Sequence, residues 1–157
     1  MLIKLIGGAI ILGVAISLSI SHIKYEDRRL RTIDGFISLL FYIKGQIDCY
    51  SLPISDILMT LSPKILADCN SEDGVFSLDE LVENSRIYLN EESQRLLDTF
   101  CAEFGSVFRA EQISRTAHYI AALSEQRKLV ECEVEKGRRV WSALYICCSL
   151  GLLILFW

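Results

Sequence analysis

The sequence predicts an all-α protein in which two terminal transmembrane helices continue into an antiparallel cytoplasmic helix bundle. Both ends of the 157-residue chain are apolar runs, although 23% of all residues are charged. Between these runs, apolar residues recur at spacings of three and four, which is typical of helices that bury one face. Strand-like alternation is not seen. We therefore expect transmembrane helix 1 at residues 1–21, a cytoplasmic helical bundle at 22–139 and transmembrane helix 2 at 140–157.

The terminal runs contain no charged residue. Residues 5–20 read LIGGAIILGVAISLSI, and residues 140–157 read VWSALYICCSLGLLILFW. Each run approaches the ~20 apolar residues that a spanning helix needs. The first run could instead be a cleaved signal peptide, and the second a buried core helix. Spanning helices are favoured because the helical pattern continues past Ser21 without a turn residue, and because eighteen charge-free residues rarely fit inside a small soluble domain.

Basic residues follow the first run and precede the second. Membrane proteins carry such residues on the cytoplasmic side, so both inner flanks and everything between them should be cytoplasmic. We expect this basic flank to face anionic lipid headgroups. It consists of Lys24, Arg28, Arg29, Arg31, Lys136, Arg138 and Arg139.

The first helix should extend far beyond the membrane. Apolar residues at helical spacing continue from Leu30 through Ile47 to about Tyr50, and nothing between Ser21 and Arg31 breaks the pattern. Ser51 and Pro53 then mark a break and a restart. A short helix, ISDILMTL, follows and should end at Ser62-Pro63, before a loop-like stretch at 67–74.

Three further helices are expected. Ser77 should cap LDELVENSRIYL, with Glu80 completing a capping box. EESQRLLDTFCAEFG is amphipathic, and Gly105 suits its C-terminal end. The last helix then continues without proline into the second terminal run. Because both long helices start from one membrane face, they must be antiparallel. The expected inward residues of the last two helices are Leu96, Leu97, Phe100, Phe104, Ile113, Ala117, Ile120, Leu123, Val130 and Val134.

Catalytic and metal-binding motifs are not found. Residues 68–80 resemble a calcium loop, but neither register places oxygen ligands and glycine correctly. His22 and His118 have no cysteine or serine motif nearby, and the six cysteines match no metal or redox spacing. We therefore expect no catalytic residue, no metal and no cofactor.

Charge is uneven along the bundle. From Asp48 to Glu103 there are twelve acids and three bases, so the part far from the membrane should repel nucleic acid and attract a basic protein. Simple solvation of the bundle is the alternative. Candidate partner-binding residues are Asp79, Glu80, Glu83, Glu91 and Glu92. Within the membrane, Gly7, Gly8 and Gly13 are candidates for packing against partner helices, although glycine is common in such helices anyway.

Four segments resemble one family. They are MLIKLIGGAIIL at 1–12, LLFYIKGQIDCYSLPISDIL at 39–58, FCAEFG at 100–105 and EKGRRVWSALY at 135–145. With the layout of two terminal spans, they are similar to the stage III sporulation protein AB family of endospore-forming bacteria. The bundle of that family in turn resembles that of the inner-membrane platform protein of type II secretion and type IV pilus machines.

The resemblance implies a non-enzymatic platform component of the channel-like complex between mother cell and forespore. The implied location is the mother-cell membrane around the forespore. The implied partners are a cytoplasmic hexameric secretion-type ATPase and other membrane components of the complex. The sequence also allows a homo-oligomer. Two other classes stay open: a small sensory or regulatory membrane protein whose bundle binds a ligand or protein, and a membrane enzyme with a polar cavity.

Overall fold

The computed structural model describes most of the chain. Its backbone is described for residues 2–50, 54–71, 77–106 and 108–156. Side chains are described for residues 13, 16–49, 56–71, 77–106, 108–141, 143–145, 147–148 and 151.

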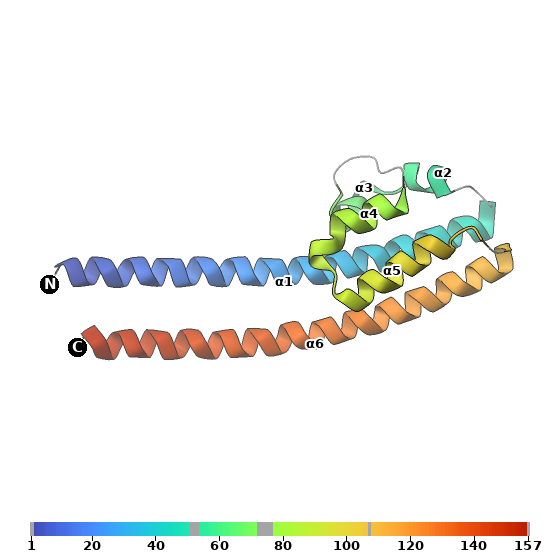
Figure 1. Cartoon of the computed structure of the whole chain (residues 1–157). Coiled ribbons are helices and arrows are strands. Elements are labelled where there is room, and N and C mark those ends of the chain that lie inside the picture. Colours follow the sequence, from blue (N-terminus) through green and yellow to red (C-terminus); the bar gives the residue numbers. More distant parts are fainter. Residues whose placement is uncertain (1, 51–53, 72–76, 107, 157) are drawn as a thin grey trace. The chain divides into compact units, whose positions relative to one another are not determined.

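The described residues form helices and connecting turns, without a strand (Figure 1). The prediction of an all-α fold is therefore confirmed for this part of the chain. The elements are α1 (Leu2–Tyr50), α2 (Ile54–Met59), α3 (Pro63–Asp68), α4 (Leu78–Ser85), the 3-10 helix η1 (Arg86–Tyr88), α5 (Glu91–Glu103) and α6 (Arg109–Phe156).

The two long helices have the predicted extents. α1 ends at Tyr50, and α6 continues without interruption into the second terminal run. Within the described residues, no helix offers a stretch that combines the length and apolarity needed to cross a membrane. The predicted spans at 1–21 and 140–157 fall largely on side chains outside the described set.

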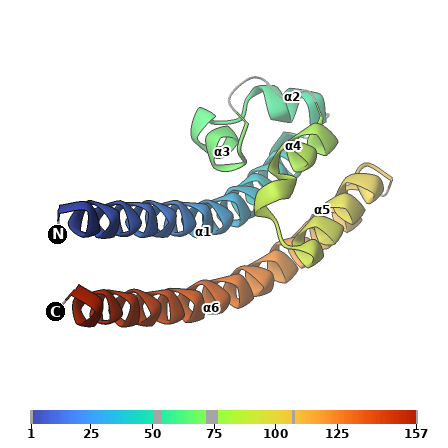
Figure 2. The ribbon, with the colours of Figure 1, turned by 60° about the vertical axis from the view of Figure 1, so that its left-hand side comes forward.

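The chain divides into two compact units. Unit 1 contains Met1–Asp27 and Glu131–Trp157, and unit 2 contains Arg28–Val130. Within unit 2, α5 runs alongside α6, and α2, α3 and α4 lie together against α1 (Figures 1 and 2). Unit 2 therefore holds the short helices that the sequence places between the two long ones.

The core of unit 2 is built on one stripe of α1. The buried residues of this stripe are Ile33, Phe36, Leu39, Leu40, Ile43 and Ile47. α6 contributes Ile120, Leu123 and Val130, while Leu97 and Phe100 come from α5. Each such side chain stabilises the fold by about 1.5–3 kcal/mol. Of the residues expected to face inward, Leu96, Phe104, Ile113 and Ala117 are only partly buried.

Ion pairs show that α1 and α6 are antiparallel in unit 2. The Arg127 guanidinium donates to both carboxylate oxygens of Asp34, at 2.8 and 3.4 Å. Arg109, eighteen residues earlier in α6, donates to the Asp48 carbonyl oxygen, fourteen residues later in α1. Since residue numbers rise along one helix as they fall along the other, the predicted antiparallel arrangement is confirmed in this unit.

One expectation about the short helices was wrong. Ser62-Pro63 does not simply end a helix, because Pro63 is the first residue of α3, with Ser62 at the N-cap. Proline suits this position since its fixed φ is helical and the missing N–H has no helical acceptor there. α3 consequently takes up Ala67 and Asp68, the first two residues of the stretch expected to be a loop.

The helix predicted at 78–89 is also divided. Ser77 caps α4 as expected, accepting a hydrogen bond from the Glu80 N–H at 3.2 Å. α4 ends at Ser85, however, and η1 follows. The Gln94 amide donates to the carbonyl oxygens of Arg86 and Leu89, at 2.8 and 3.0 Å. This side chain from α5 satisfies carbonyls that a longer helix would have bonded itself.

The connection from α5 to α6 is fixed by polar contacts. Gly105 has a φ of +79°, in the left-handed region that glycine enters readily. The buried Gln112 accepts a hydrogen bond from the Gly105 N–H at 3.2 Å. At the end of α5, one carboxylate oxygen of Glu103 accepts from both Arg115 and Tyr119, at 3.1 and 3.0 Å. The helix end predicted at Gly105 thus coincides with the turn.

Close contact between α3 and α1 depends on Gly35. A Cβ at this position would lie 2.9 Å from the Asp68 carbonyl carbon and 3.0 Å from the Cys69 backbone nitrogen. Both atoms belong to backbone that cannot easily shift. Around this contact, the Ser85 hydroxyl donates to the Cys69 carbonyl oxygen, and the Asn70 amide donates to the Asn84 carbonyl oxygen at 3.0 Å.

We predict that Gly35→Ala lowers the free energy of unfolding by about 1–3 kcal/mol, because the methyl group forces α3 away from α1. Gly45→Ala is the matched control. A Cβ at Gly45 meets no described atom within 4 Å, so this change should stabilise α1 by about 0.5–1 kcal/mol. Urea unfolding of both full-length variants, followed by circular dichroism, checks the prediction. Equal effects of the two substitutions would contradict it.

Candidate functional site

The candidate packing glycines lie in unit 1. Gly7 and Gly8 lie on the helical backbone of α1, and their surroundings are outside the described residues. A Cβ at Gly13 would meet no described atom within 4 Å. Packing of these glycines against partner helices stays a prediction.

The candidate partner-binding acids lie at the beginnings of two helices or in short ion pairs. Glu80 is in the first turn of α4, together with Asp79, and Glu91 and Glu92 form the first turn of α5. Carboxylates at these positions offset the positive end of the helix dipole. All five acids except the partly buried Glu92 are exposed. These residues therefore have a structural role in addition to any partner they contact.

Two of these acids also have arginine partners. Glu83 lies 3.1 Å from Arg86, whose guanidinium is also 3.6 Å from Asp98 on α5. Glu92 lies 2.7 Å from Arg95. Such exposed pairs stabilise a fold by at most about 1 kcal/mol. They nevertheless reduce the negative charge that this surface presents.

The five acids do not gather at one end of unit 2. Asn90, the N-cap of α5, donates to Gln126 of α6 at 3.2 Å, whereas Glu103 at the other end of α5 contacts Arg115. Glu91 and Glu92 are therefore at the end where α6 leaves unit 2. Asp79 of α4 lies instead beside Cys101, near the C-terminal end of α5, so the acids are spread along that helix.

The predicted basic flank includes two arginines with partners inside the protein. Arg28 donates to the Ala67 carbonyl oxygen at 3.1 Å and to Asn70 at 2.8 Å, and its guanidinium lies 5.8 Å from the centre of the Tyr88 ring. It thereby ties α1 to the C-terminal end of α3, where carbonyl oxygens lack helical donors. The flank also contains the partly buried Arg29 and five exposed residues: Lys24, Arg31, Lys136, Arg138 and Arg139.

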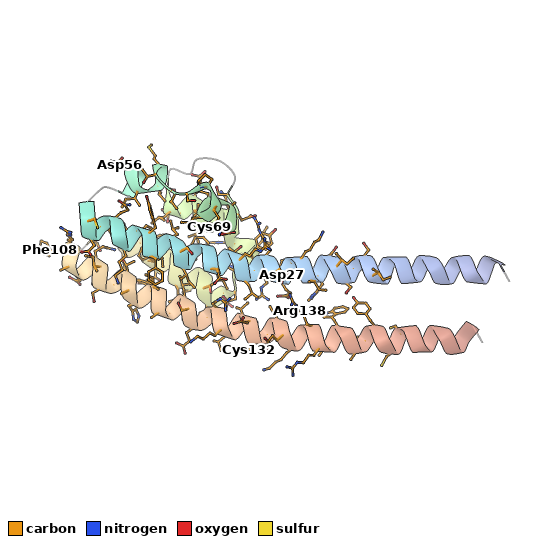
Figure 3. The ribbon with its side chains drawn as sticks, turned by 180° about the vertical axis from the view of Figure 1, so that it is seen from behind. Asp27, Asp56, Cys69, Phe108, Cys132 and Arg138 are labelled. Carbon is orange, nitrogen blue, oxygen red and sulfur yellow. The ribbon has the colours of Figure 1, made fainter. Side chains whose placement is uncertain are left out.

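Arg138 belongs to unit 1, where it donates to an Asp27 carboxylate oxygen across the two helices (Figure 3). Nearby, the rings of His22 and Trp141 lie 5.2 Å apart, with an angle of 47° between their planes. The partner of Arg138 comes five residues after His22 in α1, and Arg138 itself comes three residues before Trp141 in α6. The two helices are therefore antiparallel in unit 1 as well.

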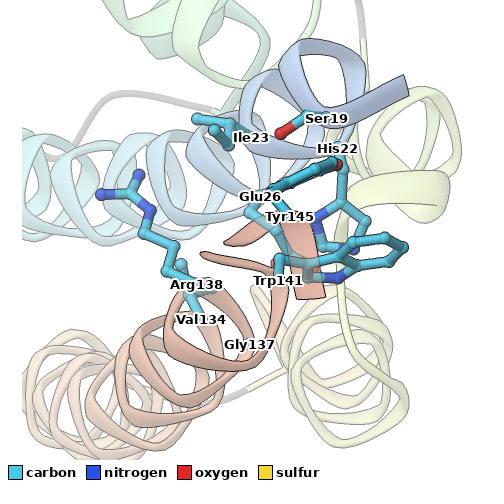
Figure 4. Close-up of a pocket in the computed structure, with 9 residues that line it drawn as sticks. All are labelled: Ser19, His22, Ile23, Glu26, Val134, Gly137, Arg138, Trp141 and Tyr145. Atoms are coloured by element: carbon cyan, nitrogen blue, oxygen red, sulfur yellow. The ribbon is translucent and has the colours of Figure 1, made fainter. Parts of the chain in front are cut away.

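These contacts border a pocket of about 220 Å³ between the two helices of unit 1 (Figure 4). From α1 it is lined by Ser19, His22, Ile23 and Glu26. From α6 it is lined by Val134, Gly137, Arg138, Trp141 and Tyr145. Each set recurs at spacings of three and four, so each is one face of its helix. The pocket exists because Ser19 and Gly137, which have the smallest side chains of their sets, leave space between the helices.

The walls and the rim of the pocket differ in chemistry. Ile23, Val134 and the rings of Trp141 and Tyr145 form apolar walls, with the two ring centres 6.1 Å apart. Glu26 and Arg138 add one charge of each sign. His22 lies 3.9 Å from a Glu26 carboxylate oxygen. The site can therefore hold a small amphipathic group, and its volume lies below the ~300 Å³ at which pockets for drug-sized ligands begin.

Sequence reasoning missed this pocket. Its residues lie on both sides of the boundary between the charge-free runs and the charged flanks. The sequence predicts membrane spans for the runs and contact with lipid headgroups for the flanks, so it treats the two regions separately. The signal was present as two stripes of helical spacing, one around Ser19 and one around Gly137. Sequence alone does not show that the two stripes face each other.

Two thiols of unit 2 are unreactive by environment. Burial raises the pKa of the Cys101 thiol to about 12, and the charges of Asp79 and Asp98 add to the shift. Burial raises the pKa of the Cys69 thiol even further. Since the thiolate is the nucleophile, neither side chain is prepared for covalent catalysis. Among the described residues, histidine, cysteine and acidic side chains form no group of three that could hold a metal ion; residues 72–76 of the calcium-like loop are outside this set.

Comparison with known families decides the relationship. The family described as stage III sporulation protein AB matches residues 75–157, more than half of the chain. The chain belongs to the stage III sporulation protein AB family. No curated protein and no solved structure matches it.

Membership in the stage III sporulation protein AB family confirms the resemblance inferred from sequence and supports a role related to sporulation. The matched stretch covers α4, η1, α5 and α6. It includes two of the four similar segments, 100–105 and 135–145. It also includes the α6 side of the pocket.

We predict that Glu80→Lys and Glu91→Lys each lower the free energy of unfolding by about 0.5–1 kcal/mol, because a positive charge in the first turn opposes the helix dipole. Glu125→Lys, an exposed position in the interior of α6, is the control and should change stability by less than about 0.5 kcal/mol. Urea unfolding of the full chain in detergent provides the measurement. A control as destabilised as the first-turn variants would show that the dipole is not the cause.

Proposed function

We propose that this member of the family is a non-enzymatic platform component of the channel-like complex between mother cell and forespore. Residues 1–21 and 140–157 would cross the mother-cell membrane around the forespore, with residues 22–139 in the cytoplasm. The chain would anchor a cytoplasmic motor ATPase to other membrane components of the complex. It would act through binding and support, without a reaction of its own.

One observation carries this proposal. Each long helix continues unbroken from a charge-free terminal run into the packed helices of unit 2: α1 over Leu2–Tyr50 and α6 over Arg109–Phe156. A protein attached at both ends in this way is suited to holding a partner at the membrane.

The side of unit 2 that carries α4 and the start of α5 is the proposed surface for the ATPase. Asp79, Glu80, Glu83 and Glu91 are exposed there. Acidic surfaces accelerate encounters with basic partners and disfavour acidic ones. A hexameric motor with a basic face towards the membrane would match this surface.

A small regulatory membrane protein is the second candidate, and the pocket of unit 1 is the observation that favours it. In that case the pocket would bind a soluble ligand whose presence is transmitted to a partner. Adjacency of the gene to a motor ATPase gene would favour the platform. Constitutive presence in vegetative cells would favour the regulator.

We predict that a membrane-impermeant maleimide leaves Cys49 unlabelled in sealed cells and labels it after the membrane is permeabilised. Cys49 is exposed near the end of α1, and the proposal places it in the cytoplasm. The buried Cys69 is the internal control and should stay unlabelled in both conditions until the protein is denatured. Mass spectrometry of the labelled peptides gives the result. Labelling of Cys49 in sealed cells would contradict the topology.

We predict that Glu83→Gln combined with Glu91→Gln reduces co-purification of the motor ATPase from sporulating cells several-fold at low salt, because two exposed charges of the proposed surface are lost. Glutamine is used because it removes the charge without placing a positive charge in the first turn of α5. Glu125→Gln with Glu135→Gln, two exposed acids of α6, is the matched control and should leave recovery unchanged. If both double variants recover the ATPase equally well, this surface does not bind it.

A further inference from the structure

The pocket of unit 1 has a size that restricts its occupant. The volume of about 220 Å³ lies below the ~300 Å³ at which pockets for drug-sized ligands begin, and the polar headgroup of a lipid is small enough for it. The open space beside Gly137, where an added Cβ meets no described atom within 4 Å, belongs to this volume.

The position of the pocket at the inner ends of the two charge-free runs points to a lipid. This step rests on the proposed function, in which the charge-free runs span the membrane. The pocket residues Ser19 and Tyr145 lie inside or at the edge of those runs, and Glu26 and Val134 lie beyond them. The pocket would then be at the level of the headgroups, where tryptophan and tyrosine gather in membrane proteins.

The charges around the pocket select among headgroups. Glu26 attracts a cation by ion pairing, and the rings of His22 and Trp141 lie beside it, with His22 3.9 Å from the carboxylate and 5.2 Å from the centre of the indole. Arg138 donates one hydrogen bond to Asp27, and its remaining N–H groups are suited to a phosphate. A headgroup that carries both charges therefore matches the site at both ends.

We propose that the pocket of unit 1 binds the headgroup of a phospholipid with a primary ammonium, the chemistry of phosphatidylethanolamine. The ammonium lies at the Glu26 carboxylate, beside the rings of His22 and Trp141, and the phosphate lies at Arg138. The ammonium donates hydrogen bonds to the Glu26 carboxylate, which the methylated ammonium of phosphatidylcholine cannot do. An anionic headgroup without an amine is disfavoured because it brings no cation to offset the charge of Glu26.

Quenching of Trp141 fluorescence tests the proposal. The chain has two tryptophans, so the full-length Trp157→Phe variant reports on Trp141 alone. It is reconstituted in three kinds of bilayer, each made mainly of unlabelled phosphatidylcholine. Each bilayer contains the same fraction of one brominated lipid, which is phosphatidylethanolamine, phosphatidylcholine or phosphatidylglycerol with bromine near the top of one acyl chain. We expect the brominated ethanolamine lipid to be enriched at Trp141 about threefold over the other two, as one exposed cation–ring contact would give.

Two variants remove the two features that the proposal needs. Glu26→Gln removes the charge that holds the ammonium, and Gly137→Leu fills the pocket. In both variants the ratio of the ethanolamine lipid to the other two lipids at Trp141 should fall from about three to about one, as expected for a non-selective surface. Their matched controls are Glu135→Gln and Gly151→Leu, at positions outside the pocket lining. Both controls should keep the threefold preference. Helix content from circular dichroism confirms that each variant is folded, and Glu26→Gln decides the question if Gly137→Leu does not fold.

The outcomes separate this inference from the proposed function. Equal quenching by all three lipids overturns the headgroup site and leaves membrane insertion standing. A preference for the glycerol lipid, or a preference that survives in Glu26→Gln, also overturns it. Absence of quenching by every brominated lipid means that Trp141 is not at a bilayer, and it overturns both the site and the proposed topology.

Discussion

The structure depends on the antiparallel pairing of two helices that come from opposite ends of the chain. Neither α1 nor α6 can bury its apolar stripe alone, and burial of such a stripe is the dominant favourable term in folding. In unit 2 the pairing is fixed by the Asp34–Arg127 ion pair beside the buried Ile33 and Leu123. In unit 1 it is fixed by Asp27 with Arg138 and by the contact of His22 with Trp141. Within unit 2 the short helices pack against this pair, α5 alongside α6 and α2, α3 and α4 against α1 (Figures 1 and 2).

Polar side chains from neighbouring helices then bond to the backbone at helix ends. Gln94 of α5 donates to carbonyl oxygens at η1, Gln112 of α6 accepts from Gly105 after α5, and Arg28 of α1 donates to the Ala67 carbonyl oxygen of α3. Helix ends offer such backbone groups because the helix itself cannot satisfy all of them. The acids at the starts of α4 and α5 belong to the same system. A surface that looks like a binding site in the sequence is therefore partly a means of holding the bundle together.

The functional features of the chain are arranged along its two long helices. The pocket in unit 1 lies where charge-free sequence gives way to charged sequence, and the acidic residues lie on the short helices of unit 2. Membership in the family does not by itself assign a role to the pocket or to the acidic residues. Under the proposed function, they would offer one site for a membrane component and another for a protein.

The sequence by itself determined the all-helical class, the end of α1 at Tyr50, the Ser77 cap, the turn at Gly105 and the family. These features follow from local spacing, local hydrogen bonding and the residues of short segments, so they can be read along the chain. Only the tertiary structure decided that α3 passes close to Gly35, that Arg28 bonds to Ala67, and that Ser19 and Gly137 line one pocket. Each of these is a contact between segments far apart in sequence, and a helical pattern shows which face is buried without showing what it is buried against.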